Sequence, residues 1–97
     1  MKVLPEPVVF EWDKGNIEKN WLKHGVSYKE IEEIFSNKPL LISEDIKHSK
    51  KEERYQALGK TNNERLIFLS FMVRNNKVRV ISARDISKKE EKIYENI

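Results

Sequence analysis

The sequence predicts an α+β fold in which an antiparallel β-sheet follows an N-terminal helical hairpin and precedes a C-terminal helix. Residues 27–30 and 87–90 both have the form of a capping box, Ser-x-x-Glu, which indicates two helix starts. The almost continuously apolar residues 65–73 and the β-branched stretch 77–85 indicate strands, joined by an Asn75-Asn76 hairpin turn. Hairpin spacing favours antiparallel pairing, with the helices gathered on one side of the sheet.

The first helix is expected between an N-cap at Asp13 and a left-handed glycine at Gly25. A short strand over residues 8–12 should precede it at a sheet edge, because prolines lie just before it. Apolar side chains recur on one face of this helix, and we expect that face to pack on the core. They are Ile17, Trp21 and Leu22.

The second helix is expected to begin at Ser27 and to end at residues 37–39, burying a stripe of Ile31, Ile34 and Phe35. Strands are then expected at residues 40–42 and 54–60, before the two strands of the hairpin. The last helix should end near Asn96. Four large aromatic residues are most simply core: Trp12, Trp21, Phe35 and Phe71.

Composition limits the classes of protein and of partner. The 97 residues are enough for one domain, residues 1–97, with one modest core. A net charge of +3, from 19 basic and 16 acidic residues, is compatible with a polyanionic partner but is weak support for one. No cysteine is present, which excludes disulfides and cysteine metal sites. The apolar runs are too short to span a membrane, so a cytoplasmic protein without a membrane partner is expected.

Five arginines lie in or beside the last three predicted strands and could contact phosphate, because a guanidinium matches a phosphate and keeps its charge. They are Arg54, Arg65, Arg74, Arg79 and Arg84. The alternative is that they are solvated charges at strand ends and in the hairpin. Arg79 and Arg84 are five residues apart, so in a regular strand they would point to opposite faces. They can share a site only if a bulge intervenes or if Arg84 lies beyond the strand.

The polar connection at residues 45–55 is a second candidate, because it gathers His48, carboxylates, Arg54 and Tyr55. These side-chain types suffice for general acid–base cleavage of RNA. The alternative is a solvated loop in which Ser49 and Glu52 form a capping box. His24 is better explained as a cation at a helix C-terminus. Neither a metal site nor a phosphate-binding glycine loop is expected, and no cofactor is expected.

An ordered series of short motifs resembles a known family. The motifs are Phe10-Glu11-Trp12-Asp13; Asn20 with Lys23-His24-Gly25-Val26-Ser27; His48-Ser49 with Glu52-Glu53-Arg54-Tyr55; Leu58-Gly59; and Ile81-Ser82-Ala83-Arg84 before Glu90 and Tyr94. The series resembles the BrnT-like toxins of bacterial type II toxin–antitoxin systems, over roughly residues 8 to 95. Lysine-rich segments between the motifs are the main departure.

The resemblance implies a RelE-like fold and a metal-independent ribonuclease, in which the RNA 2′-hydroxyl attacks the adjacent phosphate and translation and growth stop. It also implies a BrnA-like antitoxin with a ribbon-helix-helix domain, which binds operator DNA on behalf of the complex. On this basis Arg79 and Arg84 are expected to stabilise the phosphate, with Glu53 or His48 as the base. The further RNA contacts expected are Lys23, Arg54, Arg74 and Tyr94.

Two other functions remain open at this point. The same basic surface could hold nucleic acid without cutting it, or the chain could be a degenerate toxin that only binds the antitoxin.

Overall fold

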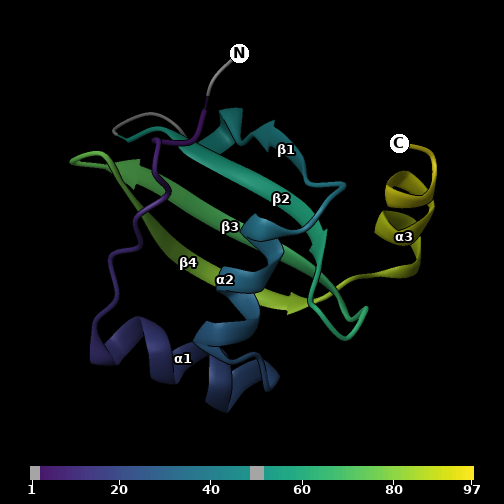
Figure 1. Cartoon of the computed structure of the whole chain (residues 1–97), viewed down its shortest axis with the longest axis horizontal. Helices are drawn as coiled ribbons and strands as arrows, with labels where there is room; N and C mark the ends of the chain where they lie inside the picture. Colours follow the sequence, from purple (N-terminus) through teal and green to yellow (C-terminus); the bar gives the residue numbers. More distant parts are fainter. Residues whose placement is uncertain (1–2, 49–51) are drawn as a thin grey trace.

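The computed structural model describes residues 3–48 and 52–97, and it confirms the α+β fold (Figure 1). The elements in chain order are α1 (Lys14–His24), α2 (Tyr28–Ser36), β1 (Leu41–Glu44), the 3₁₀ turn η1 (Ile46–His48), β2 (Arg54–Lys60), β3 (Leu66–Arg74), β4 (Lys77–Asp85) and α3 (Lys88–Glu95). None of the helices described is both long and apolar enough to cross a membrane.

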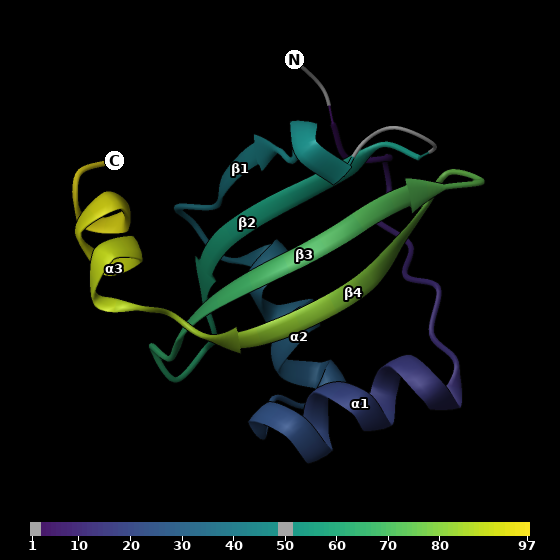
Figure 2. The same cartoon turned by 180° about the vertical axis from the view of Figure 1, so that it is seen from behind.

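The four strands form an antiparallel sheet in the order β1-β2-β3-β4. Helices α1 and α2 cover one face of this sheet, and α3 stands apart from them past the end of β4 (Figures 1 and 2). The prediction that the helices gather on one side of the sheet is therefore wrong for α3, which adjoins Leu58 and Phe68 of the other face. The β3–β4 turn uses Asn75 and Asn76 with φ of 52° and 60°, which is the backbone conformation expected of a tight hairpin. The opposite face of the sheet, which α1 and α2 leave uncovered, is called the open face.

The helix ends follow the local rules of the sequence. Asp13 and Asn16 cap α1 reciprocally, with bonds of 2.9 and 2.8 Å between side chain and backbone. Gly25 ends this helix with φ of 64°, in the left-handed region that favours glycine. The predicted capping boxes at Ser27 and Ser87 are both present.

The prediction that the apolar face of α1 packs on the core is wrong for Trp21 and Leu22. Trp21 is 58% exposed and Leu22 is 80% exposed, whereas the buried residues of α1 are Asn16 and Asn20. The reason is that α1 lies beside the edge strand β4, whose backbone needs polar partners. Asn20 Oδ1 accepts a hydrogen bond from the backbone N–H of Ala83 at 3.0 Å. The need to satisfy that N–H outweighs the periodicity of the apolar residues.

The prediction of a strand at residues 8–12 is also wrong, because this segment makes only an isolated parallel bridge, between Phe10 and Val78. Two backbone bonds flank it, from Glu11 N to Val78 O at 2.8 Å and from Val78 N to Val9 O at 2.7 Å. Prolines before this segment carry no N–H to extend the pairing, and Asp13 already begins α1. The segment nevertheless brings Glu11 alongside β4.

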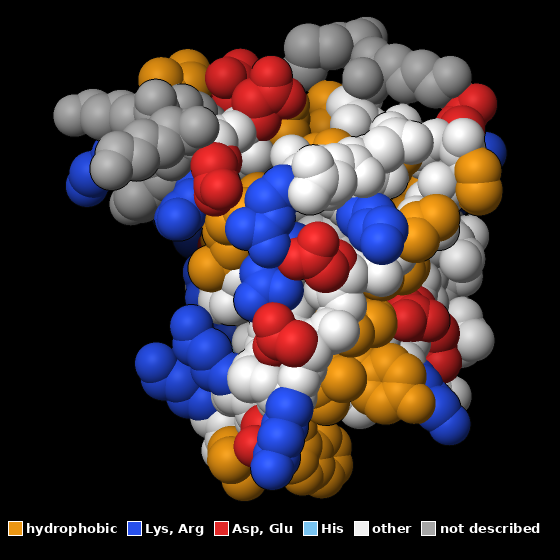
Figure 3. Space-filling model, turned by 90° about the vertical axis from the view of Figure 1, so that its left-hand side faces the viewer, with side chains coloured by type: hydrophobic (Ala, Val, Ile, Leu, Met, Phe, Trp, Pro, Cys, Tyr) orange, Lys and Arg blue, Asp and Glu red, His pale blue; other side chains and the backbone are white. Residues whose placement is uncertain are grey.

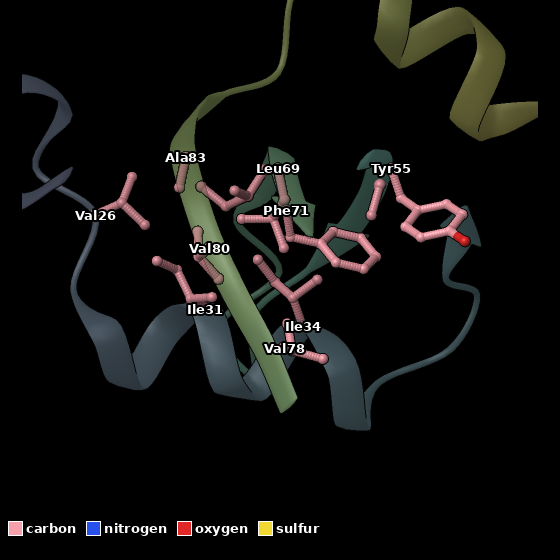
Figure 4. Close-up of a cluster of buried hydrophobic side chains, with 11 residues drawn as sticks. Val26, Ile31, Ile34, Tyr55, Leu69, Phe71, Val78, Val80 and Ala83 are labelled. Atoms are coloured by element: carbon pink, nitrogen blue, oxygen red, sulfur yellow. The ribbon is translucent and has the colours of Figure 1, made fainter. Parts of the chain in front are cut away.

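The core lies between the helices and the covered face of the sheet (Figure 4). Phe71 is fully buried, and the ring of Phe35 packs edge-on against it with centroids 5.4 Å apart. Gly59 allows close contact between β2 and α2, because a Cβ there would lie 2.5 Å from Ile34 Cγ2. Trp12 and Phe35 pack partly buried against this core as predicted, but the exposed Trp21 does not.

Candidate functional site

A β-bulge in β4 determines which side chains reach the open face. Ser70 of β3 pairs with Ser82, but the next residue, Phe71, pairs with Val80. Ile81 is therefore an extra residue in β4, and side chains after it change face relative to a regular strand.

The bulge puts Arg79 and Arg84 on the same face of the sheet. Arg79 pairs with Met72 and Arg84 pairs with Phe68. Met72 and Phe68 are an even number of residues apart in β3, so both point to the open face, and paired residues share a face. The intervening bulge that a shared face requires is present. The two arginines still stand about 14 Å apart along the strand, at roughly 3.4 Å per residue.

In the middle of the open face, cross-strand pairs form three successive rows, each about 7 Å from the next. The basic row is Arg54, Met72 and Arg79. The polar row is Ser43, Gln56, Ser70 and Ser82. The apolar row is Leu41, Leu58 and Phe68, with Arg84 at its end.

In the basic row, two carboxylates hold the Arg79 guanidinium. Nη2 donates to Asp13 Oδ2 at 2.7 Å, and Nη1 donates to Glu11 Oε1 at 3.2 Å. The bond to Asp13 is the main cause that raises the pKa of Arg79. The pKa of Asp13 is lowered, first by the backbone N–H of Asn16 and then by Arg79. The guanidinium is therefore charged and fixed in direction.

Arg74 joins this cluster from the end of β3. Its Nη2 donates to Glu11 Oε1, the same oxygen that accepts from Arg79. The bond from Arg74 is the main cause that lowers the pKa of Glu11. Arg74 Nη1 also lies 4.0 Å from Glu52 Oε1, so the residue two positions before β2 lies beside the cluster. Figure 3 views the molecule from the side of this hairpin and shows blue and red side chains interleaved.

A hollow of about 320 Å³ adjoins Arg79 between α1 and the open face. Three cationic side chains line it, Arg54, Lys19 and Arg79, together with the carboxylate of Asp13. Lys23 follows Lys19 by one helical turn on the same flank of α1. Cations converging from a helix and two strands suit an anion such as a phosphate of a nucleic acid.

Arg84 is held differently, at the far end of the face. It makes a two-pronged ion pair with Glu90 of α3, with both N–O distances 2.9 Å, and its Cζ lies 4.2 Å from the centre of the Phe68 ring. The bond from Arg84 is the largest cause that lowers the pKa of Glu90 to about 2. Arg84 therefore links the sheet to α3.

The side chain of Glu53 lies on the side of the sheet that α1 and α2 cover. Its Oε2 accepts a hydrogen bond of 2.8 Å from the hydroxyl of Tyr55, whose ring packs against Phe71 in the core. This bond is the main cause that raises the pKa of Tyr55 to about 12. Arg54, the residue between them, points to the open face. The structure thus separates Glu53 from the basic row by the thickness of the sheet.

The other predicted site residues are scattered. Tyr94 is buried, and its hydroxyl donates to Pro39 O at 2.6 Å, away from the basic row. Arg65 binds Asp85 and Glu30 and therefore joins the end of β4 to α2. The side chain of His48 lies outside the described part of the chain.

Sequence reasoning missed three residues of this site: Glu11, Asp13 and Lys19. Asp13 was explained fully by its role as an N-cap. Glu11 and Asp13 are two residues apart in an extended segment, so their side chains point to the same side. This spacing could have identified them as a pair. Among residues 3–48 and 52–97, no three histidine, aspartate or glutamate side chains are grouped closely enough to hold a metal ion.

Comparison with known proteins identifies the family. No curated protein matches the chain. A family model described as the ribonuclease toxin, BrnT, of type II toxin–antitoxin systems matches residues 12–90, a range that contains Asp13, Lys19, Arg54, Arg79 and Arg84. Because this match covers most of the sequence, the chain belongs to the BrnT family of ribonuclease toxins of type II toxin–antitoxin systems.

Proposed function

We propose that this toxin is a metal-independent endoribonuclease whose cleavage site is the hollow beside Arg79. Family membership implies an RNA target and an antitoxin partner. The observation that supports this location is the convergence of Arg54, Arg79 and Lys19 on one hollow of the open face.

The reaction is attack of a ribose 2′-oxygen on its adjacent phosphorus. The bond from phosphorus to the 5′-oxygen of the next nucleotide breaks, leaving a 2′,3′-cyclic phosphate and a 5′-hydroxyl. A base takes the proton of the 2′-hydroxyl, and an acid protonates the leaving oxygen. The pentacoordinate phosphorane carries extra negative charge, which cations stabilise more strongly than they stabilise the ground state.

Arg79 is our proposal for the main transition-state contact. Its bonds to Asp13 and Glu11 fix the plane of the guanidinium before RNA binds. Pre-fixed donors stabilise a transition state well because they need little reorganisation. Arg54, Lys19 and Lys23 would position the flanking phosphates, and Arg74 would contact RNA at the hairpin end. Arg84 would contact a phosphate farther along the strand.

The general base is proposed to be His48, because Glu52, four residues after it, lies beside Arg74 of the cluster. An imidazole has the ordinary pKa best suited to proton transfer near neutral pH. Glu53 is the second proposal for the base, and it would need to leave Tyr55 to reach RNA. Tyr94 would act only if α3 moved, because its hydroxyl is bonded to Pro39.

The cellular part of the proposal follows from RNA cleavage. Loss of RNA would stop translation and growth in the cytoplasm. A ribbon-helix-helix antitoxin would neutralise the toxin, and operator DNA would be bound through that antitoxin.

Expression of the chain without its antitoxin tests the function. We expect growth arrest, a fall in amino-acid incorporation, and RNA fragments with 2′,3′-cyclic phosphate ends that also form in EDTA. Arg79→Ala should abolish these effects while remaining folded, and Lys92→Ala, on α3, is the matched control. Intact RNA with folded wild-type protein would contradict the proposal. Such a result would favour a binding module without catalysis.

A further inference from the structure

A second hollow of about 310 Å³ lies between the open face and α3, separate from the one beside Arg79. Its floor is the apolar row of the sheet: Leu41, Leu58 and Phe68. Side chains of α3 form the opposite wall, among them Ile93 and Glu90. Ser43 and Gln56 of the polar row line its remaining side.

Helix α3 does not fill this space. Two contacts hold α3: Arg84 binds Glu90 at the end of β4, and Tyr94 is buried with its hydroxyl bonded to Pro39 O. Ile93 on the hollow side remains 47% exposed. An apolar floor that its own helix leaves open, with a few polar groups at the side, is typical of a pocket for a small planar ligand group.

The arrangement of the three rows indicates which group of a bound RNA would enter this hollow. The basic row lies about 14 Å from the apolar row, with the polar row between them, at about 7 Å per step. Phosphates would lie at Arg54, Arg79 and Arg84, whereas a base could leave the strand and enter the apolar hollow. Sequence-specific recognition of RNA commonly uses single-stranded bases turned out in this way, placed on apolar or aromatic side chains.

We infer that the hollow under α3 holds one unstacked nucleobase of the RNA substrate, and that Gln56 reads its edge. The inference rests on the proposed function, because it needs RNA bound along the open face. A glutamine amide offers one donor and one acceptor side by side, which match N7 and the N6 amino group of adenine. Adenine is therefore the expected base, with Ser43 as a second hydrogen-bonding group.

Binding of oligonucleotides that cannot be cut tests this pocket independently of catalysis. The probes are 2′-O-methyl pentanucleotides, which lack the attacking hydroxyl, with adenine, cytosine, guanine or uracil at the central position. The wild-type chain should bind the adenine probe on the order of tenfold more tightly than the others. Gln56→Ala should remove this preference. Gln56→Glu replaces the amide donor by an acceptor and should favour cytosine, whose N4 amino group donates.

Asn63→Ala, in the exposed β2–β3 turn, is the matched control and should keep the wild-type preference. Equal affinities for the four probes, or an adenine preference that survives Gln56→Ala, would overturn the inference. It would also be overturned if Gln56→Ala weakened binding of the purified antitoxin and left the base preference unchanged, because the hollow would then hold an antitoxin side chain. Failure of cleavage with the base preference intact would instead contradict only the proposed catalysis.

Discussion

Replacing Asn20 by leucine tests why α1 turns a polar face to the sheet. Asn20 is 1% exposed; its Oδ1 accepts from Ala83 N at 3.0 Å and its Nδ2 donates to Asn16 O at 3.0 Å. Leucine has a similar volume and would add buried apolar area, worth roughly 2 kcal/mol if burial alone decided. However, it would leave the N–H of Ala83 without its partner, which costs about 1–3 kcal/mol, and the Asn16 carbonyl would lose a donor.

We therefore expect Asn20→Leu to destabilise the protein by about 2 kcal/mol, because two lost bonds, at about 1–3 kcal/mol each, outweigh the apolar gain of roughly 2 kcal/mol. At about 4–8 °C per kcal/mol for a chain of this size, the melting temperature should fall by roughly 8–16 °C. Urea unfolding measures the free energy, and amide exchange at Ala83 should speed up. Leu22→Asn is the control, because Leu22 is 80% exposed, and it should change stability by less than about 0.5 kcal/mol. An Asn20→Leu protein as stable as wild type would refute the reasoning.

Three other predictions follow from the same contacts. Acid should weaken the ion pair between Arg84 and Glu90. The pKa of Glu90 in the folded protein is about 2, below its ordinary value of 4.5, because Arg84 stabilises the carboxylate. The contribution of Glu90 to stability is therefore complete above about pH 4.5 and is lost as the pH falls through about 2. Unfolding curves at pH 5 and pH 2.5 should show this loss in wild type, and Glu90→Gln should reduce the difference between them. Ile31→Ala should lower the free energy of unfolding in urea by about 2–5 kcal/mol, because Ile31 is 1% exposed in the core. Trp21→Ser should lower it far less, because Trp21 is 58% exposed. Similar losses for the two variants would contradict the exposed position of Trp21 on α1. Arg79→Ala should reduce the magnitude of the slope of log affinity for single-stranded RNA against log salt by about 0.7, the value for one lost phosphate contact. An unchanged slope would show that Arg79 does not contact the RNA.

The parts of the fold that depend on neighbours in sequence could be predicted. The caps at Ser27 and Ser87 and the glycine end of α1 need only residues within one turn, and all are present. The hairpin needs only its two asparagines. Helix starts and tight turns are therefore accessible from sequence because their energetics are local.

The buried face of α1 could not be predicted, because it depends on a strand that lies far along the chain. The periodicity of the helix predicts Trp21 and Leu22 on the buried face, but the N–H of Ala83, 63 residues after Asn20, donates to Asn20 and so draws the polar face inward. The bulge at Ile81 has no sequence signal that we identified. Without it, the parity of Arg79 and Arg84 predicts opposite faces.

The site residues show the same division. The arginines were recognisable from their place beside strands, but their carboxylate partners were not. Glu11 and Asp13 lie 68 and 66 residues from Arg79, and the isolated bridge at Phe10 is what carries them to β4. A pair of acids before a helix becomes part of a basic site only through this long-range contact.

The polar face of α1 connects stability to the proposed site. Ala83 bonds to Asn20, Asn20 to Asn16, Asn16 to Asp13, and Asp13 to Arg79. Each link holds the next in place, so the buried asparagines that support the bulged strand also fix the direction of the Arg79 guanidinium. A fully apolar helix face could bury more area, but it could not hold either the bulge or the arginine. Trp21 and Leu22 are then exposed because α1 turns its polar side to β4 and so holds Arg79 in place.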